Sequence, residues 1–185
     1  YSKDETNFRN SDIKNYIESI KYITSQGGWV IRMGDPSMQK LPSMEQVIDY
    51  ANHPAKNALL DIYLIEGCDF FIGTSSGMIH VAELFNKPML FTNAVSYLND
   101  LPQKPEDLII FKHVKSKSMN RELSLREWLD SCDKIQTSTW SSTDWEYIEN
   151  TSMEILTATR EFLNYRPQDE VSKLQMDFKD LHILK

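Results

Sequence analysis

The hydrophobic positions along the chain fall into two patterns, helical spacing and short continuous runs, and these follow one another in turn. Residues 13–26 carry apolar side chains at helical spacing, with Ser11 or Asp12 as the N-cap and Gly27 as the end. The pattern returns at residues 57–66 and 78–85, so we predict three helices in this part of the chain.

Short β-prone runs separate these helices and predict strands. The predicted strands are residues 29–33, 69–73, 89–93 and 108–111. Strands that alternate with helices at this spacing are typical of a parallel sheet with right-handed crossovers. The sequence therefore predicts an α/β fold.

Residues 36–54 and the last third of the chain each depart from this alternation of helices and strands. Residues 36–54 contain three prolines and predict a loop that faces a site, with a short strand at Val47 to Tyr50. Beyond Ser124 the spacing predicts mostly helix, including a long helix from Thr143 to Tyr165 and a polar helical tail to Lys185. We predict a first domain over residues 1–123 and a helical C-terminal extension over residues 124–185 that packs on it.

Composition narrows the class of protein. The chain has 185 residues and a net charge of −7, which weighs against nucleic acid as a partner because such proteins collect Lys and Arg. The densest basic stretch, Lys112 to Lys117, is interpreted as a solvated loop. No apolar run approaches the ~20 residues of a transmembrane helix. We expect a soluble protein.

Two cysteines without metal-ligand spacing, Cys68 and Cys132, favour a reduced cytoplasmic setting and predict no metal site. The chain begins without Met, so we expect a fragment of a longer protein.

The sequence FFIGTSSGMIH, Phe70 to His80, is the strongest candidate for chemistry. A strand, a turn of small residues and a helix start place several backbone N–H groups at one point, and the first turn of a helix attracts anions. The six residues of this turn are Gly73, Thr74, Ser75, Ser76, Gly77 and Met78. In the alternative, Ser76 is a plain N-cap and Gly77 a turn residue.

Other candidates surround this turn. Arg32 and Asp35 follow the strand at residues 29–33, and Arg32 suits a two-pronged contact to phosphate, or else an ion pair with Asp35 or Asp49. His80 and Glu83 follow on the predicted helix, as ligand contacts or as structural residues. Arg9 is a weaker phosphate candidate.

Motifs of several enzyme classes are absent from the sequence. It contains no Walker P-loop, GxGxxG, HExxH or GxSxG pattern and no convincing DxD pair. These absences weigh against a nucleoside triphosphatase, a dehydrogenase and a serine hydrolase.

The segment FIGTSSGMIHVAELFNKPMLFTN resembles the C-terminal donor-binding motif of GT-B glycosyltransferases, and heptosyltransferase-like families carry a similar turn. The order of VIRMGD, VIDYA, LDIYL and CDFFIGTSSG is similar to a bacterial family of surface-polysaccharide glycosyltransferases. The resemblance covers residues 7–95. One departure is Ser75, which stands where the heptosyltransferase-like turn has an acidic residue.

The resemblance implies a Rossmann-like domain, one half of a GT-B fold, that binds a nucleotide diphosphate sugar without metal or other cofactor. Residues 73–78 would surround the diphosphate, with Arg32 and His80 nearby. Catalysis would take place against an N-terminal Rossmann-like domain that this chain lacks. Because that domain often supplies the base, the catalytic residues stay unknown.

We therefore expect the donor-binding half of a glycosyltransferase that transfers a sugar to a glycan or other hydroxyl acceptor. Two alternatives stay open. One is a non-catalytic α/β binding or assembly module, and the other is a sugar-nucleotide epimerase-like or pyruvyltransferase enzyme.

Overall fold

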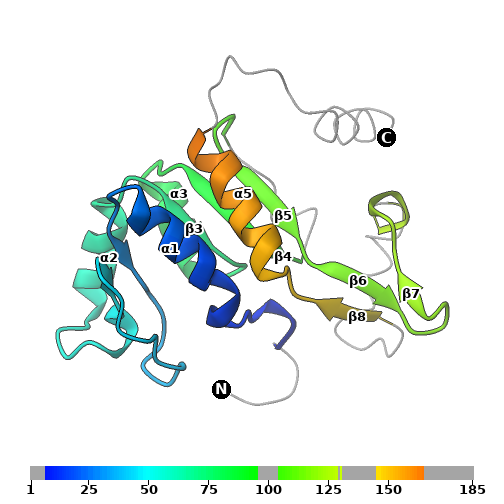
Figure 1. Cartoon of the computed structure of the whole chain (residues 1–185), viewed down its shortest axis with the longest axis horizontal. Helices are drawn as coiled ribbons and strands as arrows, with labels where there is room; N and C mark the ends of the chain where they lie inside the picture. The colour runs from blue at the N-terminus through cyan, green and yellow to red at the C-terminus, as the bar shows by residue number, and fades with distance from the viewer. Residues whose placement is uncertain (1–6, 96–103, 129, 131–144, 165–185) are drawn as a thin grey trace.

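Parallel strands between two layers of helices form the core of the protein (Figure 1). The computed structural model describes residues 7–95, 104–128, 130 and 145–164. The elements in chain order are η1 Asn7–Arg9, η2 Ile13–Tyr16, α1 Ile17–Ser25, β1 Val30–Ile31, β2 Val47–Ile48, η3 Tyr50–Asn52, α2 Ala58–Glu66, β3 Phe71–Gly73, α3 Gly77–Leu84, β4 Met89–Ala94, β5 Leu108–Phe111, β6 His113–Ser116, β7 Arg121–Glu122, β8 Trp145–Ile148 and α5 Ser152–Asn164.

The strands form two parallel groups and one antiparallel group. Strands β3, β4 and β5 are parallel neighbours, with Phe71 opposite Met89 in the register. Strands β1 and β2 form a separate parallel pair. Met33, two residues after β1, packs against the core cluster that includes Ile79 and Ala82 of α3. This is the Rossmann-like α/β arrangement that the sequence predicts.

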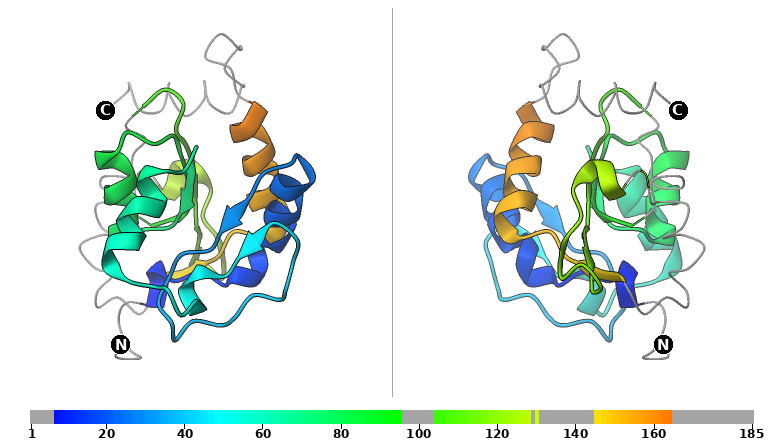
Figure 2. Two further views of the ribbon diagram at one scale, coloured as in Figure 1. Left: turned by 90° about the vertical axis from the view of Figure 1, so that its left-hand side faces the viewer. Right: turned by 90° about the vertical axis from the view of Figure 1, so that its right-hand side faces the viewer.

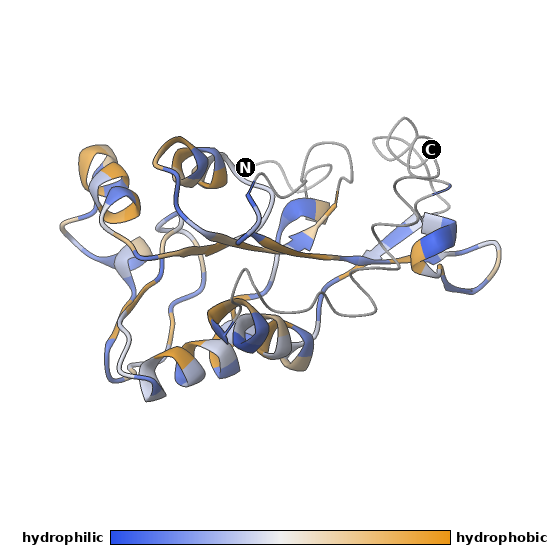
Figure 3. Ribbon diagram, turned by 90° about the horizontal axis from the view of Figure 1, so that it is seen from above, coloured by the Kyte–Doolittle hydropathy of each residue, from blue (hydrophilic) through white to orange (hydrophobic). Residues whose placement is uncertain are grey.

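Helices cover both faces of the parallel strands (Figures 2 and 3). α1 and α5 lie on one face, and α2 and α3 lie on the other. β4 is buried along its whole length because it contributes to both cores. Met89 and Phe91 pack toward α2 and α3, whereas Leu90 packs against Phe162 of α5. Side chains of successive strand residues point to opposite faces, and β4 therefore joins the two layers.

The predicted first helix is divided into two parts. Asp12 caps η2 by accepting from the N–H of Lys14 at 2.9 Å, and α1 continues from Ile17. The predicted strand at Val47 to Tyr50 ends at Ile48, because Tyr50 turns into η3 and is buried.

The largest correction concerns residues 145–148, where the predicted helix is a strand. β8 pairs antiparallel with β6, with Trp145 opposite Ser116 and Ile148 opposite His113. Together with β7 these strands form a three-stranded sheet beyond β5 (Figure 1). The helix α5 begins only at Ser152. The predicted helical tail, residues 165–185, lies outside the described residues.

The prediction of a solvated loop at Lys112 to Lys117 is also wrong. This stretch includes β6, and both Lys112 and Ser116 are buried. A lysine tolerates burial because its aliphatic stem packs while the ammonium group reaches a partner. Among the described residues, no helix is long and apolar enough to cross a membrane.

Candidate functional site

The turn between β3 and α3 lies where the sequence places the candidate anion site, at the carboxyl end of a parallel strand. β3 ends at Gly73 and α3 begins at Gly77. Ser76 occupies the N-cap position in extended conformation, but its side chain makes no capping hydrogen bond. Ser76 and Gly77 are exposed, so the start of α3 faces solvent. The plain N-cap interpretation of Ser76 therefore lacks the bond that would carry it.

The two glycines of the turn occupy their positions for different physical reasons. A Cβ at Gly73 would lie 2.5 Å from the Phe71 ring, so packing accounts for that glycine. A Cβ at Gly77 would meet nothing within 4 Å, and Gly77 does not have a positive φ. Neither packing nor backbone conformation requires a glycine there. A reason that remains for glycine at this position is the close approach of a bound group to the backbone.

His80 and Glu83 are brought together on α3. His80 Nδ1 lies 2.8 Å from Glu83 Oε2, and the His80 side chain is 68% exposed. Met78 instead packs against the core under α3. The first turns of α3 thus present one histidine and one carboxylate on their exposed side.

Arg32 is buried and paired, in the way that the ion-pair alternative describes. Its Nη1 lies 3.0 Å from Asp49 Oδ1, and the residue is 8% exposed. The other Asp49 oxygen accepts from the N–H of Leu41 at 3.0 Å and from Asn52 Nδ2 at 3.1 Å. Burial raises the pKa of Asp49, but the hydrogen bonds from Leu41 and Arg32 outweigh it and hold that pKa below its ordinary value. The pair holds the loop at residues 32–49 in place.

Asp35 forms a local turn in the same loop. Its Oδ1 accepts from the Ser37 hydroxyl at 2.6 Å and the Ser37 N–H at 2.9 Å. These bonds lower the pKa of Asp35. Asp35 stays exposed and ionised, which makes it a poor neighbour for a phosphate.

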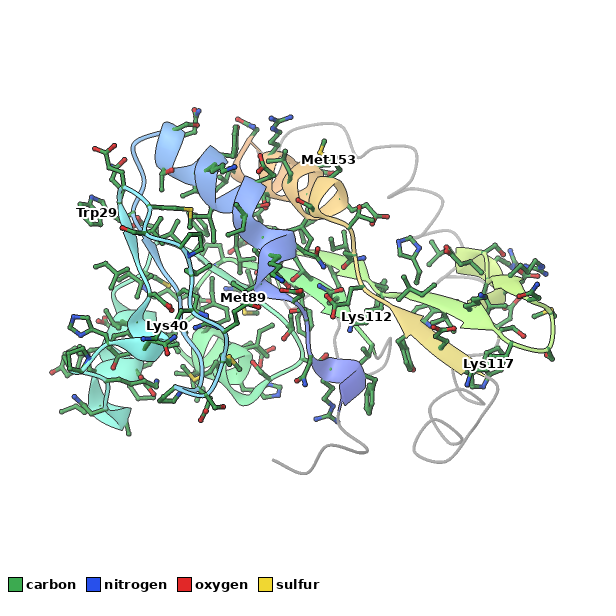
Figure 4. The ribbon with its side chains drawn as sticks, turned by 60° about the horizontal axis from the view of Figure 1, so that its bottom comes forward. Trp29, Lys40, Met89, Lys112, Lys117 and Met153 are labelled. Atoms are coloured by element: carbon green, nitrogen blue, oxygen red, sulfur yellow. The ribbon has the colours of Figure 1, made fainter. Side chains whose placement is uncertain are left out.

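Arg9 is exposed at the end of η1. Its neighbour Phe8 stacks on Tyr147 of β8, with ring centroids 5.7 Å apart. Lys112 Nζ donates to the Asn10 carbonyl at 2.6 Å, and Figure 4 shows Lys112 between this segment and the strands. Burial lowers the pKa of Lys112, and the nearby Glu149 acts in the opposite direction.

A buried polar network at the carboxyl end of β4 is missing from the sequence-based prediction. Thr92 and Asn93 are both 0% exposed, and Asn93 has a left-handed φ of 52°. Tyr16 contacts both side chains from η2. Asn93 and Asn150 exchange two hydrogen bonds of 2.7 Å, each between one side-chain oxygen and the partner's N–H. In the sequence, the polar residues at the end of an otherwise apolar strand were the signal that could have indicated this network.

The hydrogen bonds of this network cover part of the edge of the sheet at which the parallel strands end. Asn150 Nδ2 also donates to the Phe111 carbonyl at the end of β5, at 2.7 Å. The carboxyl ends of β4 and β5 are therefore covered by the protein's own residues. Because ligands of open α/β sheets bind beyond the carboxyl ends of the strands, the β3–α3 turn is the exposed candidate at this edge.

A pocket of about 340 Å³ lies in the proline-containing loop, which includes Lys40 (Figure 4). Its lining residues are Lys40, Leu41, Pro42, Ser43, Val47, Asp49, Asn52, His53 and Pro54. None of them belongs to the β3–α3 turn. In the described part of the chain, no group of three or more His, Cys, Asp or Glu residues has a metal-binding arrangement.

The fold and this edge define a Rossmann-like α/β domain with an exposed strand-to-helix turn. Comparison of the chain with protein-family models, curated proteins and solved structures finds no match in any of the three.

Proposed function

We propose that the β3–α3 turn binds the diphosphate of a nucleotide sugar, and that the chain is the donor-binding half of a glycosyltransferase. The observation that carries this proposal is the exposed start of α3, where Ser76 makes no side-chain cap and Gly77 is glycine without a structural reason. An anion at that place would take the hydrogen bonds and the helix dipole that a capping side chain leaves available.

The strength of such a site depends on a few charge-assisted hydrogen bonds. Each contributes roughly 1.5 to 3 kcal/mol, about twice the contribution of a neutral pair. Two or three amides of the turn would hold a diphosphate firmly and would stabilise it as the leaving group of sugar transfer. Small side chains at residues 73–77 let the phosphate reach the backbone.

His80 and Glu83 are proposed to contact the sugar or ribose hydroxyls. The pair lies on the exposed side of α3, within two helical turns of the phosphate site. The carboxylate of Glu83 is suited to accept from hydroxyls. Arg32 is left out of the proposed contacts because its guanidinium is buried against Asp49.

Transfer itself is proposed to need a second Rossmann-like domain, which would bring the glycan or other hydroxyl acceptor. Neither a base nor a resident metal or cofactor is assigned to this half. In the competing proposal the chain is a non-catalytic assembly module. Exposed apolar side chains of α2 favour this alternative, with Leu59 67% and Tyr63 63% exposed. Such a module binds no nucleotide, so one experiment separates the two.

Calorimetry with UDP, GDP, ADP, dTDP and CMP is the test. We expect at least one nucleoside diphosphate to bind below millimolar concentration, and CMP, which lacks the second phosphate, to bind more weakly. The variant Gly77→Val should weaken that binding by at least tenfold, because a branched side chain keeps phosphate from the backbone.

The thermal midpoint provides the control for Gly77→Val. Because a Cβ at residue 77 meets nothing within 4 Å, the variant should melt within a few degrees of the wild type. Absence of any nucleoside diphosphate binding below millimolar concentration would refute the proposed function. If the variant binds the nucleoside diphosphate with unchanged affinity, the phosphate does not lie against Gly77.

A further inference from the structure

Tyr16 places its hydroxyl group at the centre of the buried polar network. The Tyr16 oxygen lies 2.7 Å from Thr92 Oγ1, 3.1 Å from Asn93 Nδ2 and 3.1 Å from Ser11 Oγ. Thr92 Oγ1 in turn donates to the Gly73 carbonyl at 3.1 Å. Gly73 is the last residue of β3 and directly precedes the proposed phosphate turn.

The donors and acceptors of this network fix its direction. A hydroxyl has one hydrogen to donate, and the hydrogen of Thr92 goes to Gly73. The contact between Tyr16 and Thr92 therefore requires Tyr16 to donate. The Tyr16 oxygen then accepts from Asn93 and Ser11, which uses both of its lone pairs. The result is one directed chain that ends on the Gly73 carbonyl.

The Gly73 carbonyl belongs to the same planar unit as the N–H of Thr74. The described part of the chain has no cis peptide bond, so this C=O and N–H point in opposite directions. Holding the carbonyl toward Thr92 of β4 turns the Thr74 N–H away from β4. The pairing of Gly73 with Phe91 in the β3–β4 ladder gives the peptide this orientation, and the Tyr16 hydroxyl, more than fifty residues earlier in the chain, supports it through Thr92.

We propose that the Tyr16 hydroxyl is a positioning group for the phosphate site: through Thr92 it adds to the β3–β4 ladder in holding the Gly73–Thr74 peptide plane, and with it the direction of the first amide of the turn. This inference rests on the proposed binding of a nucleoside diphosphate. Tyr16 itself touches no ligand in the proposal. Its role is preorganisation, which improves affinity by lowering the cost of ordering the site.

The chain supplies a matched control in Tyr50. Its hydroxyl donates to the Asn57 carbonyl at 3.2 Å and accepts from the Asn57 N–H at 3.1 Å, at the start of α2. Tyr50→Phe and Tyr16→Phe each remove one hydroxyl from a network inside the protein. Only Tyr16→Phe removes a hydroxyl from the series of hydrogen bonds that leads to the Gly73 carbonyl. A second pair tests the next link: Thr92→Val removes the donor to Gly73, and Thr92→Ser keeps it.

The experiment measures the Thr74 amide by NMR without ligand, and then the affinity for the tightest-binding nucleoside diphosphate by calorimetry. In Tyr16→Phe and Thr92→Val we expect a shifted, faster-exchanging Thr74 amide and an affinity lower by about tenfold. In Tyr50→Phe and Thr92→Ser we expect the wild-type amide and an affinity within twofold of wild type.

Two results separate the inference from the proposed function. If Tyr16→Phe and Tyr50→Phe change the Thr74 amide and the affinity equally, the positioning role is wrong, because general loss of stability accounts for both. If the wild type binds no nucleoside diphosphate while Tyr16→Phe but not Tyr50→Phe shifts the Thr74 amide, Tyr16 helps to hold the peptide plane and the proposed function is overturned.

Discussion

At the scale of single residues, burial separates the charged groups that hold the fold from those that face solvent. Arg32 has the residue type of a phosphate ligand, but its ion pair with Asp49 is mostly buried, with side chains 7% and 19% exposed. The His80–Glu83 pair is shorter and far more exposed. In the sequence both pairs read as a basic residue and a carboxylate, and their burial is what differs between them.

Asp49→Asn should destabilise the protein by roughly 3 kcal/mol at pH 7, because it leaves the Arg32 charge buried without its counter-ion. The folded pKa of Asp49 is lowered, so its stabilising effect is complete above the ordinary value of about 3.9 and is lost as the pH falls through the folded pKa. Urea unfolding at pH 7 and pH 3 should show the difference between wild type and variant narrow at pH 3.

The exposed pair Glu18–Lys21 is the control for this measurement. Its atoms are 2.8 Å apart, as close as in many buried pairs, but its side chains are 47% and 59% exposed. Glu18→Gln should cost less than about 1 kcal/mol at pH 7. A cost for Asp49→Asn as small as that of Glu18→Gln would show that Arg32 is not held by this pair.

At the scale of elements, caps define where the helices begin. Thr151 and Glu154 form a capping box before α5: Glu154 Oε2 accepts from the Thr151 N–H at 2.7 Å, and Thr151 Oγ1 accepts from the Glu154 N–H at 3.3 Å. Burial raises the pKa of Glu154, but the Thr151 and His113 bonds outweigh it and leave that pKa below its ordinary value. The pattern T-x-x-E occurs twice in the sequence, at Thr143 to Glu146 and at Thr151 to Glu154, and the hydrogen bonds of the second copy place the start of α5 at residue 152.

Thr151→Ala should lower the free energy of unfolding by about 1 kcal/mol, because the box loses its hydroxyl acceptor for the Glu154 N–H. Thr157→Ala on the same helix is the matched control, since the exposed Thr157 hydroxyl only donates back to the Met153 carbonyl. Alanine is the better helix former there, so stability should stay equal or rise. Chemical denaturation measures the free energy of unfolding of both variants. Equal losses of stability would show that Thr151 does not cap α5.

At the scale of the whole molecule, Asn93 and Asn150 connect the parallel strands to the segment that leads into α5. The two residues are 57 positions apart and both are buried, and Asn150 also reaches the end of β5. Asn93 keeps a left-handed backbone at the end of a strand, a conformation that asparagine tolerates better than most residues. These contacts close the sheet edge at β4 and β5, whereas Ser76 and Gly77 after β3 stay exposed.

Asn150→Ala should cost roughly 3 kcal/mol or more, because it leaves the Asn93 N–H and the Phe111 carbonyl buried without this partner. Asn164→Ala at the exposed end of α5 should cost under about 1 kcal/mol. Urea unfolding followed by tryptophan fluorescence and by circular dichroism should give coincident transitions for both variants. A loss for Asn150→Ala no larger than for Asn164→Ala would show that the network does not join the layers.

The sequence by itself determined the α/β fold and the exposed turn at residues 73–77, because hydrophobic period, glycines and caps are local signals. It placed three helices and the strand at residues 108–111 to within a few positions. Tertiary structure decided what needs distant partners: the strand at residues 145–148, which pairs with β6; the burial of Arg32 and Lys112; and the network around Tyr16, Asn93 and Asn150. No local pattern encodes a contact between residues far apart in the sequence, and each of these features depends on such a partner.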